Sequence, residues 1–305
     1  MITALSMNPC IDLTHYIDVI NRGGHHRAKR IRRDVCGKAV NVAYALANLG
    51  EATKLLGFDF IENGELLKDS LQKAGVAYDL VPVPGAIRTN VKIFEEESSV
   101  MTEFNQEGDP VSEENLAILI DKVINTKSSV LILSGSLPSG LDAGVYGEII
   151  KQTKTPVILD AFGPALEIGL KAGAYIIKPN LHELEVTFGR KLPTRSAQLE
   201  MGRKLLEENP KLRAICLSLG SDGALMIGRN EAFFAPALDI PVRGVQGAGD
   251  SLVAGIALEK PDAGLDILLK SAVATAAASL IREGTLMATE EGRKEMLGRV
   301  EIINV

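Results

Sequence analysis

The apolar and polar positions of the chain form two alternating patterns. Short apolar runs bounded by turn residues are typical of buried strands, and they occupy Ile2–Met7, Thr53–Gly57, Val130–Leu133, Val157–Leu159, Tyr175–Ile177 and Ala214–Leu217. Between them, apolar residues three or four apart predict helices at Ala39–Leu49, Gly64–Ala74, Glu113–Asn125, Val145–Thr153 and Ala197–Glu208. The alternation predicts an α/β fold with a mainly parallel central sheet flanked by helices.

Two segments break the alternation. Residues 10–33 and 87–104 have the pattern of extended chain, and Val91–Phe94 and Val100–Phe104 are suited to a hairpin around Glu95–Ser99. We expect a small accessory sheet or lid here. Because no repeat, low-complexity tract or linker divides the chain, we expect residues 1–305 to form one domain.

Composition and charge exclude several functions. The net charge is −6, and the short basic run Arg27–Arg33 is the one exception to an even charge distribution. Nucleic acid is therefore not an expected partner, and the run fits a solvated strand or a site for a small anion. Asn8, Pro9 and Asp12 interrupt any signal-peptide core, and the apolar run Ala272–Ile281 is too short to span a bilayer. We expect a soluble, cytoplasmic protein without a membrane partner.

The cysteines and histidines show no metal-ligand spacing. Cys10, Cys36 and Cys216 are odd in number and far apart in the sequence, which indicates a reducing compartment rather than a disulfide framework. The histidines, His15, His25, His26 and His182, form no zinc pattern.

The most informative segment is the glycine turn at residues 244–252, Gly-Val-Gln-Gly-Ala-Gly-Asp-Ser-Leu, which precedes a helical run from Ser251 to Glu259. Glycines allow a tight turn that exposes main-chain N–H groups at a helix N-terminus, where an anion such as a phosphoryl group binds well. Asp250 would then accept a proton from an attacking hydroxyl. The alternative is a plain turn with Asp250 as the helix N-cap.

Three further motifs suit a sugar phosphate. Lys38 and Asn41 lie three residues apart at the start of a helix after Gly37, so they would share one face of that helix. There Lys38 would supply a positive charge for the phosphate, and the Asn41 amide would bind the sugar hydroxyls. Two exposed polar residues without a ligand would show the same spacing. Arg88 has the guanidinium fork that binds phosphate, or it is a plain surface arginine. Asp12 would accept from sugar hydroxyls, or cap a turn.

Two motifs suit a nucleotide and its metal ion. Asn180 and Glu183 follow a strand and open a helix, so they fit either a hydrated Mg²⁺ or a capping box. The segment Ser218–Ala224, with Gly220 and Gly223, has the pattern of a strand–turn–strand that a nucleotide could approach. Many glycine-rich hairpins share that pattern.

These motifs, in this order, resemble the PfkB (ribokinase-like) carbohydrate kinases, and within them the 1-phosphofructokinase and tagatose-6-phosphate kinase branch. The resemblance runs from about residue 5 to about residue 285. Its stretches are Asn8-Pro9-Cys10-Ile11-Asp12, Gly37-Lys38-Ala39-Val40-Asn41-Val42-Ala43, Arg88-Thr89-Asn90, Thr102-Glu103-Phe104-Asn105, Ser134-Gly135-Ser136-Leu137-Pro138, Lys178-Pro179-Asn180-Leu181-His182-Glu183, Ser218-Leu219-Gly220-Ser221-Asp222-Gly223 and Gly247-Ala248-Gly249-Asp250-Ser251.

The resemblance implies a ribokinase-like fold and a role for each matching residue. Asp250 would be the base, and the N–H groups of Gly247, Ala248 and Gly249 the anion hole. Asn180 and Glu183 would organise Mg²⁺. The substrate would contact Asp12, Gly37, Lys38, Asn41, Arg88 and Asn105. ATP would contact Lys178, Ser218, Gly220, Gly223, Ala272, Thr275 and Ser279, the last three as a wall beside the adenine. Closure of the lid would exclude water.

Three departures from the family pattern affect the choice of sugar more than the transfer of the phosphoryl group. Cys36 and Ala39 replace family glycines around Gly37 and would narrow the floor of the sugar pocket. Phe60 and Ile61 stand where many members have a glycine pair, and Val245-Gln246 lack a family threonine.

The favoured hypothesis is an ATP- and Mg²⁺-dependent kinase acting on fructose 1-phosphate or tagatose 6-phosphate, with fructose 6-phosphate as another candidate sugar. The alternative is a kinase-like sensor that binds a sugar phosphate without turnover. A dinucleotide-dependent oxidoreductase is not favoured, because no Gly-x-Gly-x-x-Gly follows the first strand. An exposed edge of the accessory sheet would favour a homodimer through the lid.

Overall fold

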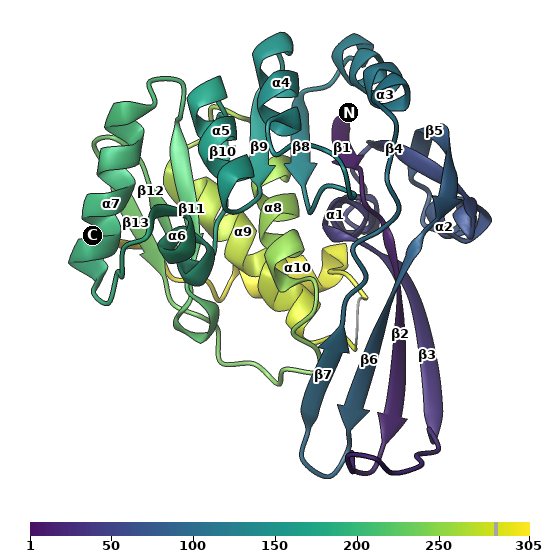
Figure 1. Cartoon of the computed structure of the whole chain (residues 1–305). Helices are drawn as coiled ribbons and strands as arrows, with labels where there is room; N and C mark the ends of the chain where they lie inside the picture. The colour runs from purple at the N-terminus through teal and green to yellow at the C-terminus, as the bar shows by residue number, and fades with distance from the viewer. Residues whose placement is uncertain (284–285) are drawn as a thin grey trace.

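The structure, a computed structural model, describes residues 1–283 and 286–305 (Figure 1). Within these residues the main sheet has ten strands, in the order β14 (Ile303–Asn304), β13 (Ala232–Ala235), β12 (Ala224–Ile227), β11 (Ala214–Ser218), β10 (Ile176–Ile177), β9 (Val157–Asp160), β8 (Val130–Ser134), β1 (Ile2–Ser6), β4 (Thr53–Glu62) and β5 (Ala77–Ala86). Neighbours from β5 to β11 are parallel, whereas β12, β13 and β14 add an antiparallel edge. The predicted mainly parallel α/β fold is confirmed.

Helices cover the sheet and explain its apolar strands. They are α1 (Lys38–Asn48), α2 (Gly64–Lys73), α3 (Glu113–Asn125), α4 (Val145–Gln152), α5 (Pro164–Ala172), α6 (Leu181–Phe188), α7 (Arg195–Glu208), α8 (Ala248–Leu258), α9 (Leu265–Leu280) and α10 (Glu290–Leu297). Every residue of β1 and β8 is buried, as expected for parallel strands with helices on both sides. Neither strand shows polar–apolar alternation for this reason.

Close packing joins the helices that support the site. α8 contacts α1 on one side and α9 on the other. Gly255 of α8 lies so near α9 that a Cβ at this position would be 2.6 Å from the Cα of Ala272. The glycine therefore lets the two helices approach backbone to backbone and fixes the position of α8 relative to the sheet.

A second, four-stranded sheet projects from the main body (Figure 1), and we call it the lid. Its order is β3 (Arg30–Cys36), β2 (Cys10–Ile17), β6 (Arg88–Glu95) and β7 (Val100–Phe104). The predicted hairpin is present, with Glu95 opposite Val100 across the antiparallel pair β6–β7. The small β-sheet lid predicted from the sequence is confirmed.

Pairing within the lid brings two of the cysteines together. Cys10 of β2 is directly opposite Cys36 of β3, and their Sγ atoms are 3.4 Å apart. Two cysteines that are 26 positions apart in the sequence thus meet where β2 and β3 pair.

The lid has a polar face and an apolar face. Asp12, Thr14, Asn90 and Lys92 are buried on the first. The other face carries Ile31, Val100 and Phe104, whose exposed fractions are 57%, 49% and 57%.

The departure at Phe60 and Ile61 has a structural explanation. β4 continues through both residues instead of turning at a glycine pair. Phe60 is buried against Phe58, with the ring centroids 6.5 Å apart, and Ile61 is exposed. The two residues thus lengthen β4, which ends at Glu62 just before α2.

None of the helices within the described residues is both long enough and apolar enough to cross a bilayer.

Candidate active site

The glycine turn begins α8. Gly247 is its N-cap with φ 77°, a left-handed conformation that favours glycine. The helix starts at Ala248, three residues before the predicted start, so Asp250 lies inside the first turn. The alternative in which Asp250 is the N-cap is therefore wrong. The first N–H groups of the helix have no partner within it and are free to bind an anion.

Asp250 is buried at the start of α8, with an exposed fraction of 7%. The Nδ2 atom of Asn41 donates a hydrogen bond to its Oδ2 atom at 2.8 Å. Burial raises the pKa of Asp250 to about 6, and the negative charge of Asp160 adds to that rise, whereas Asn41, Lys38 and Lys178 lower it. Asp250 is thus mostly ionised at neutral pH and has a pKa close to it, which suits a general base.

Lys38 and Lys178 converge on Asp160. Asp160, at the carboxyl end of β9, has no exposed surface. Its Oδ1 atom is 3.4 Å from Nζ of Lys38 and 3.1 Å from Nζ of Lys178, and the Ser134 hydroxyl donates to its Oδ2 atom at 3.0 Å. Burial raises the pKa of Asp160, but the two lysines outweigh it and hold that pKa below its usual value. The carboxylate therefore stays ionised and fixes both ammonium groups.

The two lysines lie beside the glycine turn. A Cβ on Gly249 would be 3.6 Å from Nζ of Lys178, so that ammonium borders the N-terminus of α8. Burial lowers the pKa of Lys38, but the charges of Asp160, Glu183 and Asp250 raise it further and keep the ammonium protonated. Positive charge and free N–H groups thus face the same space as Asp250.

Asn180 and Glu183 form a complete capping box at the start of α6. The Asn180 side chain accepts from Glu183 N at 2.8 Å, and Glu183 Oε2 accepts from Asn180 N at 2.9 Å. The other carboxylate oxygen, Oε1, lies 3.5 Å from Nζ of Lys38. The capping box and a role in metal binding are therefore compatible, because Oε1 is directed into the charged cluster.

Two of the predicted sugar-side residues, Lys38 and Arg88, line a cavity of about 150 Å³ between the lid and the main sheet. Its other lining residues are Ser6, Asn8, Ser134, Gly135, Ser136, Asp160, Ala161 and Phe162. Arg88 is held there by the carbonyl oxygens of Gln106, at 2.9 Å, and Asn8, at 3.4 Å. The prediction that Lys38 and Asn41 are merely exposed polar residues is wrong, because Asn41 is buried and Lys38 lines the cavity.

Asp12, Gly37 and Asn105 lie at the lid side of the site. Asp12 accepts from Asn90 at 2.9 Å and forms an ion pair with Lys92 at 2.6 Å. Gly37 has φ 133° and is the N-cap of α1, where a Cβ would be 3.3 Å from the Cα of Pro9. Asn105 directly follows β7 and is exposed. It is not among the described residues that line the cavity.

The residues expected around ATP divide into two groups. Ser218 ends β11, next to Asn180 in a parallel bridge, and Gly220 starts a 3₁₀ turn over Gly220–Asp222 with open space beside it. Gly223 has φ 110°, and a Cβ there would be 2.0 Å from the carbonyl oxygen of Ala235. This glycine is thus required for the hairpin itself.

The α9 residues expected beside the adenine are buried. Ala272, Thr275 and Ser279 have exposed fractions of 0%, 0% and 3%. The hydroxyls of Thr275 and Ser279 donate to main-chain oxygens of their own helix, Ser271 O and Ala276 O. Ala272 and Thr275 pack against Gly255 of α8. The assignment of these side chains to a wall beside the adenine stays a prediction, and in the structure they serve the packing of α8 on α9.

Comparison with known proteins now identifies the family. Residues 5–291 match the model of the pfkB family carbohydrate kinases. The chain belongs to the PfkB family. It is 32% identical to the 1-phosphofructokinase of Borreliella burgdorferi over 84% of this chain and 83% of that protein. It is 28% identical to the 1-phosphofructokinase of Bacillus subtilis over 99% of both chains. The fold of the phosphofructokinase-2 of Escherichia coli in complex with potassium superposes with a TM-score of 0.91, at 25% identity and 98% coverage of each chain.

Kinases of the PfkB family use ATP with Mg²⁺, and this chain has oxygen groups that suit the metal ion. Mg²⁺ prefers oxygen ligands and usually keeps several of its waters. The Glu183 carboxylate has one oxygen outside the capping box, and Asn180 Oδ1 retains a second lone pair. The pair therefore fits a hydrated magnesium ion held partly through water.

Sequence reasoning missed Asp160 and Ser134 as functional residues. Ser134 ends β8 and Asp160 ends β9, where ligands collect in parallel sheets, but neither residue was assigned a role from the sequence. The pairing of Asp160 with Lys38 joins residues 122 positions apart. The available signal was the unusual polar residue at the end of each buried strand.

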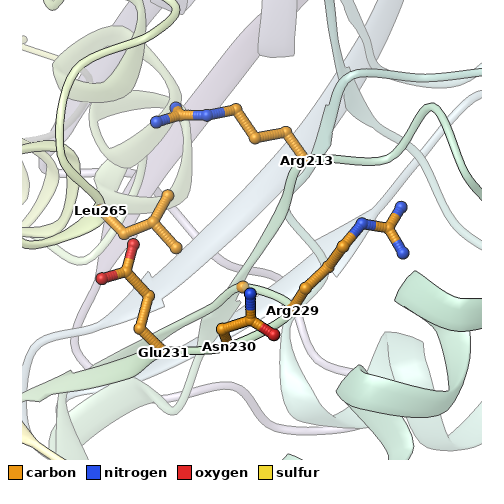
Figure 2. A pocket seen from close by; sticks show the side chains of 6 residues that line it. Arg213, Arg229, Asn230, Glu231 and Leu265 are labelled. Carbon is orange, nitrogen blue, oxygen red and sulfur yellow. The ribbon is translucent and has the colours of Figure 1, made fainter.

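A larger hollow, of about 500 Å³, lies at the far end of β11 and β12 and is lined by Arg213, Gly228, Arg229, Asn230, Glu231 and Leu265 (Figure 2). Its two guanidinium groups are already bound to main-chain oxygens. Arg213 donates to Pro261 and Ala263, and Arg229 donates to carbonyls between Leu206 and Leu212. These arginines therefore hold neighbouring loops against the ends of β11 and β12. Because their guanidinium groups are already bound, the cluster around Asp250 is the better candidate for the active site.

Proposed function

We propose that this PfkB-family kinase transfers the γ-phosphoryl group of ATP to a primary hydroxyl of a ketohexose phosphate, with residues 1–305 acting as one domain. The observation that carries the proposal is the position of Asp250. It is buried in the first turn of α8, has a pKa of about 6, and borders two ammonium groups. A base, an anion-binding helix terminus and fixed positive charge are the groups that phosphoryl transfer needs.

In the proposed reaction, Asp250 accepts the proton of the sugar hydroxyl. The hydroxyl oxygen forms a bond to the γ-phosphorus, the bond between that phosphorus and the bridging oxygen breaks, and ADP leaves with the electron pair. Asn41 positions the Asp250 carboxylate through the bond at 2.8 Å. The Oδ1 atom of Asn41 is buried and without a partner among the described residues, so it is suited to accept from a substrate hydroxyl.

The charge that develops on the transferred group is stabilised by the start of α8. The N–H groups of the turn from Gly247 through Ala248 and Gly249 point at the phosphoryl oxygens. Lys178 adds an ammonium beside this turn, and Lys38 supplies another between the base and the sugar cavity. When bound, Mg²⁺ neutralises the nucleotide phosphates, and Asn180 and Glu183 hold it together with its waters.

The sugar phosphate is proposed to occupy the cavity lined by Arg88 and Lys38, which supply positive charge for its existing phosphate. Asp12, Gly37 and Asn105 contact the sugar from the lid side. Ser218, Gly220 and Gly223 border the nucleotide. Closure of the lid excludes water, which would otherwise accept the phosphoryl group.

Fructose 1-phosphate is the first candidate substrate, supported by the names of relatives about 30% identical, and tagatose 6-phosphate is the second. The test is an ADP-release assay over fructose 1-phosphate, tagatose 6-phosphate, fructose 6-phosphate and unphosphorylated ketoses, with Asp250→Asn as the matched background. Saturable ADP release by the wild-type protein with one ketohexose phosphate supports the proposal. Calorimetric binding of a sugar phosphate without ADP release from any of them would instead identify a sensor.

We further propose a homodimer through the apolar face of the lid. Leu13, Val91 and Phe104 are paired across neighbouring strands on this face, and Phe104 is 57% exposed. An exposed apolar patch of this kind is typical of a protein–protein interface. Sedimentation velocity is expected to show a dimer whose dissociation constant rises on Phe104→Ser. A monomer at micromolar concentration would contradict this proposal without affecting the kinase proposal.

A further inference from the structure

The base of the lid contains a group of metal-ligand atoms that phosphoryl transfer does not explain. Cys10, Asp12 and Cys36 each offer one ligand atom, and these atoms all lie within 4.8 Å of one another. All three residues are buried, with exposed fractions of 4%, 4% and 3%. Cys10 begins β2 and Cys36 ends β3, so the group lies where the lid joins the main body.

We infer that Cys10, Cys36 and Asp12 form a binding site for a thiophilic divalent cation of the Zn²⁺ class. In a tetrahedral zinc site with bonds of about 2.3 Å to sulfur, two ligand sulfurs lie about 3.8 Å apart. The Sγ atoms here are 3.4 Å apart, and Cys10 Sγ is 3.7 Å from Asp12 Oδ1. A disulfide would need the sulfurs at about 2.05 Å, so the observed spacing is closer to that of two ligands on one ion.

The surroundings supply what a buried ion requires. Asp12 Oδ1 accepts from Asn90 at 2.9 Å, and Lys92 pairs with Oδ2 at 2.6 Å. Such outer contacts orient a ligating carboxylate. Two thiolates and one carboxylate carry three negative charges, which the cation and the buried Lys92 ammonium balance. A neutral group of this kind avoids the cost of an unpaired buried charge. A water completes the fourth position, and binding releases both thiol protons.

Binding at this site would regulate the kinase, an inference that rests on the proposed role of Asp12. A cation held by Asp12 occupies the carboxylate that is proposed to contact the sugar. It also ties β2 to β3 next to Gly37, one residue before Lys38, which lines the sugar cavity. The cation is therefore expected to compete with the sugar phosphate and not with ATP.

The test uses the full-length reduced protein, freed of metal. It is titrated with Zn²⁺ against a chromophoric chelator, and with Co²⁺, whose charge-transfer absorption reports thiolate ligands. We expect one ion per chain, and a loss of affinity of at least about 100-fold in Cys10→Ala and Cys36→Ala. Cys216→Ala is the matched control, because Cys216 is buried in β11 away from the lid, and it is expected to bind as the wild-type protein does.

Two results would overturn the metal site. One is the failure of the folded wild-type protein, shown by mass spectrometry to lack a Cys10–Cys36 disulfide, to bind Zn²⁺ or Co²⁺ stoichiometrically. The other is binding that survives both alanine substitutions. These readouts do not depend on kinase activity.

A separate calorimetric titration tests the competition. Zn²⁺ is expected to weaken sugar-phosphate binding at least tenfold in the wild-type protein and to leave it unchanged in Cys36→Ala. Equal weakening in both proteins would disprove the competition.

Discussion

The carboxyl ends of the main-sheet strands and the lid hold their charged groups in different ways. At the carboxyl end of β9, Asp160 pairs with both Lys38 and Lys178, and the three groups leave the start of α8 open. In the lid, Asp12 is already engaged by both Asn90 and Lys92. The first arrangement is the one proposed to receive the phosphoryl group, whereas in the second the carboxylate already has an ammonium and an amide as partners.

This difference separates chemistry from selectivity. The groups proposed to transfer the phosphoryl lie on α1, α6, α8 and strands of the main sheet, and α1 packs on both α8 and β1. The groups proposed to select the sugar lie partly on a projecting sheet. Substitutions in the first region are therefore expected to lower kcat, and those in the second to raise KM.

The largest expected effect is that of Asp250→Asn. The amide has nearly the same shape but cannot accept the hydroxyl proton, so kcat is expected to fall by about 10³-fold. Steady-state ADP release measures this, with thermal unfolding and ATP binding as checks on folding. Activity within tenfold of the wild-type value would show that Asp250 is not the base.

Asp160→Asn is expected to cost stability as well as activity. It removes the carboxylate from between two buried or half-buried ammonium groups, so the free energy of unfolding is expected to fall by about 3 kcal/mol. Urea unfolding measures this change, and Asp69→Asn, an exposed carboxylate on α2, is the control. An unchanged unfolding midpoint would mean that the cluster does not hold this part of the structure together.

Arg88→Ala tests the sugar side. Loss of one charged phosphate contact is expected to raise KM for the sugar phosphate by about 10- to 100-fold, with little change in KM for ATP. Arg203→Ala, an exposed arginine on α7, is the control and is expected to leave both constants unchanged. Equal increases in the two KM values would remove Arg88 from the sugar site.

The smallest effect is a shift of the pH profile. The base must be ionised, so kcat/KM is expected to fall as pH decreases through about 6, the pKa of Asp250. The bond from Asn41 favours the ionised form, and Asn41→Ala is therefore expected to move this limb of the profile to higher pH. Asn48→Ala, exposed near the end of the same helix, serves as the control. A limb that stays in place would disprove the coupling of Asn41 to Asp250.

Much of the fold was predictable from local patterns. The predicted helix Glu113–Asn125 has the bounds of α3, where Ser112 accepts from Asn115 N as an N-cap. The strand β5 escaped prediction because Pro82, Pro84 and Gly85 interrupt its sequence, and prolines are tolerated only where a strand needs no N–H on that side. The edge position of β5 is a tertiary property that the local pattern does not contain.

The site was only partly predictable for a similar reason. The glycine turn and the Asn-x-x-Glu pair are local motifs, so the sequence identified them directly. The contacts of Asp160 with Lys38 and of Cys10 with Cys36 depend on strands that meet only in the folded chain. Likewise, the α9 hydroxyls are buried because Gly255 of α8 lets the two helices approach closely.

The prolines of β5 have a further consequence for behaviour in solution. β5 is the terminal strand of the main sheet, with Pro82 and Pro84 exposed. A strand edge with free N–H groups is a template for other chains, and proline removes those donors. The two prolines that made β5 hard to predict thus protect the protein against aggregation along the parallel edge of its main sheet.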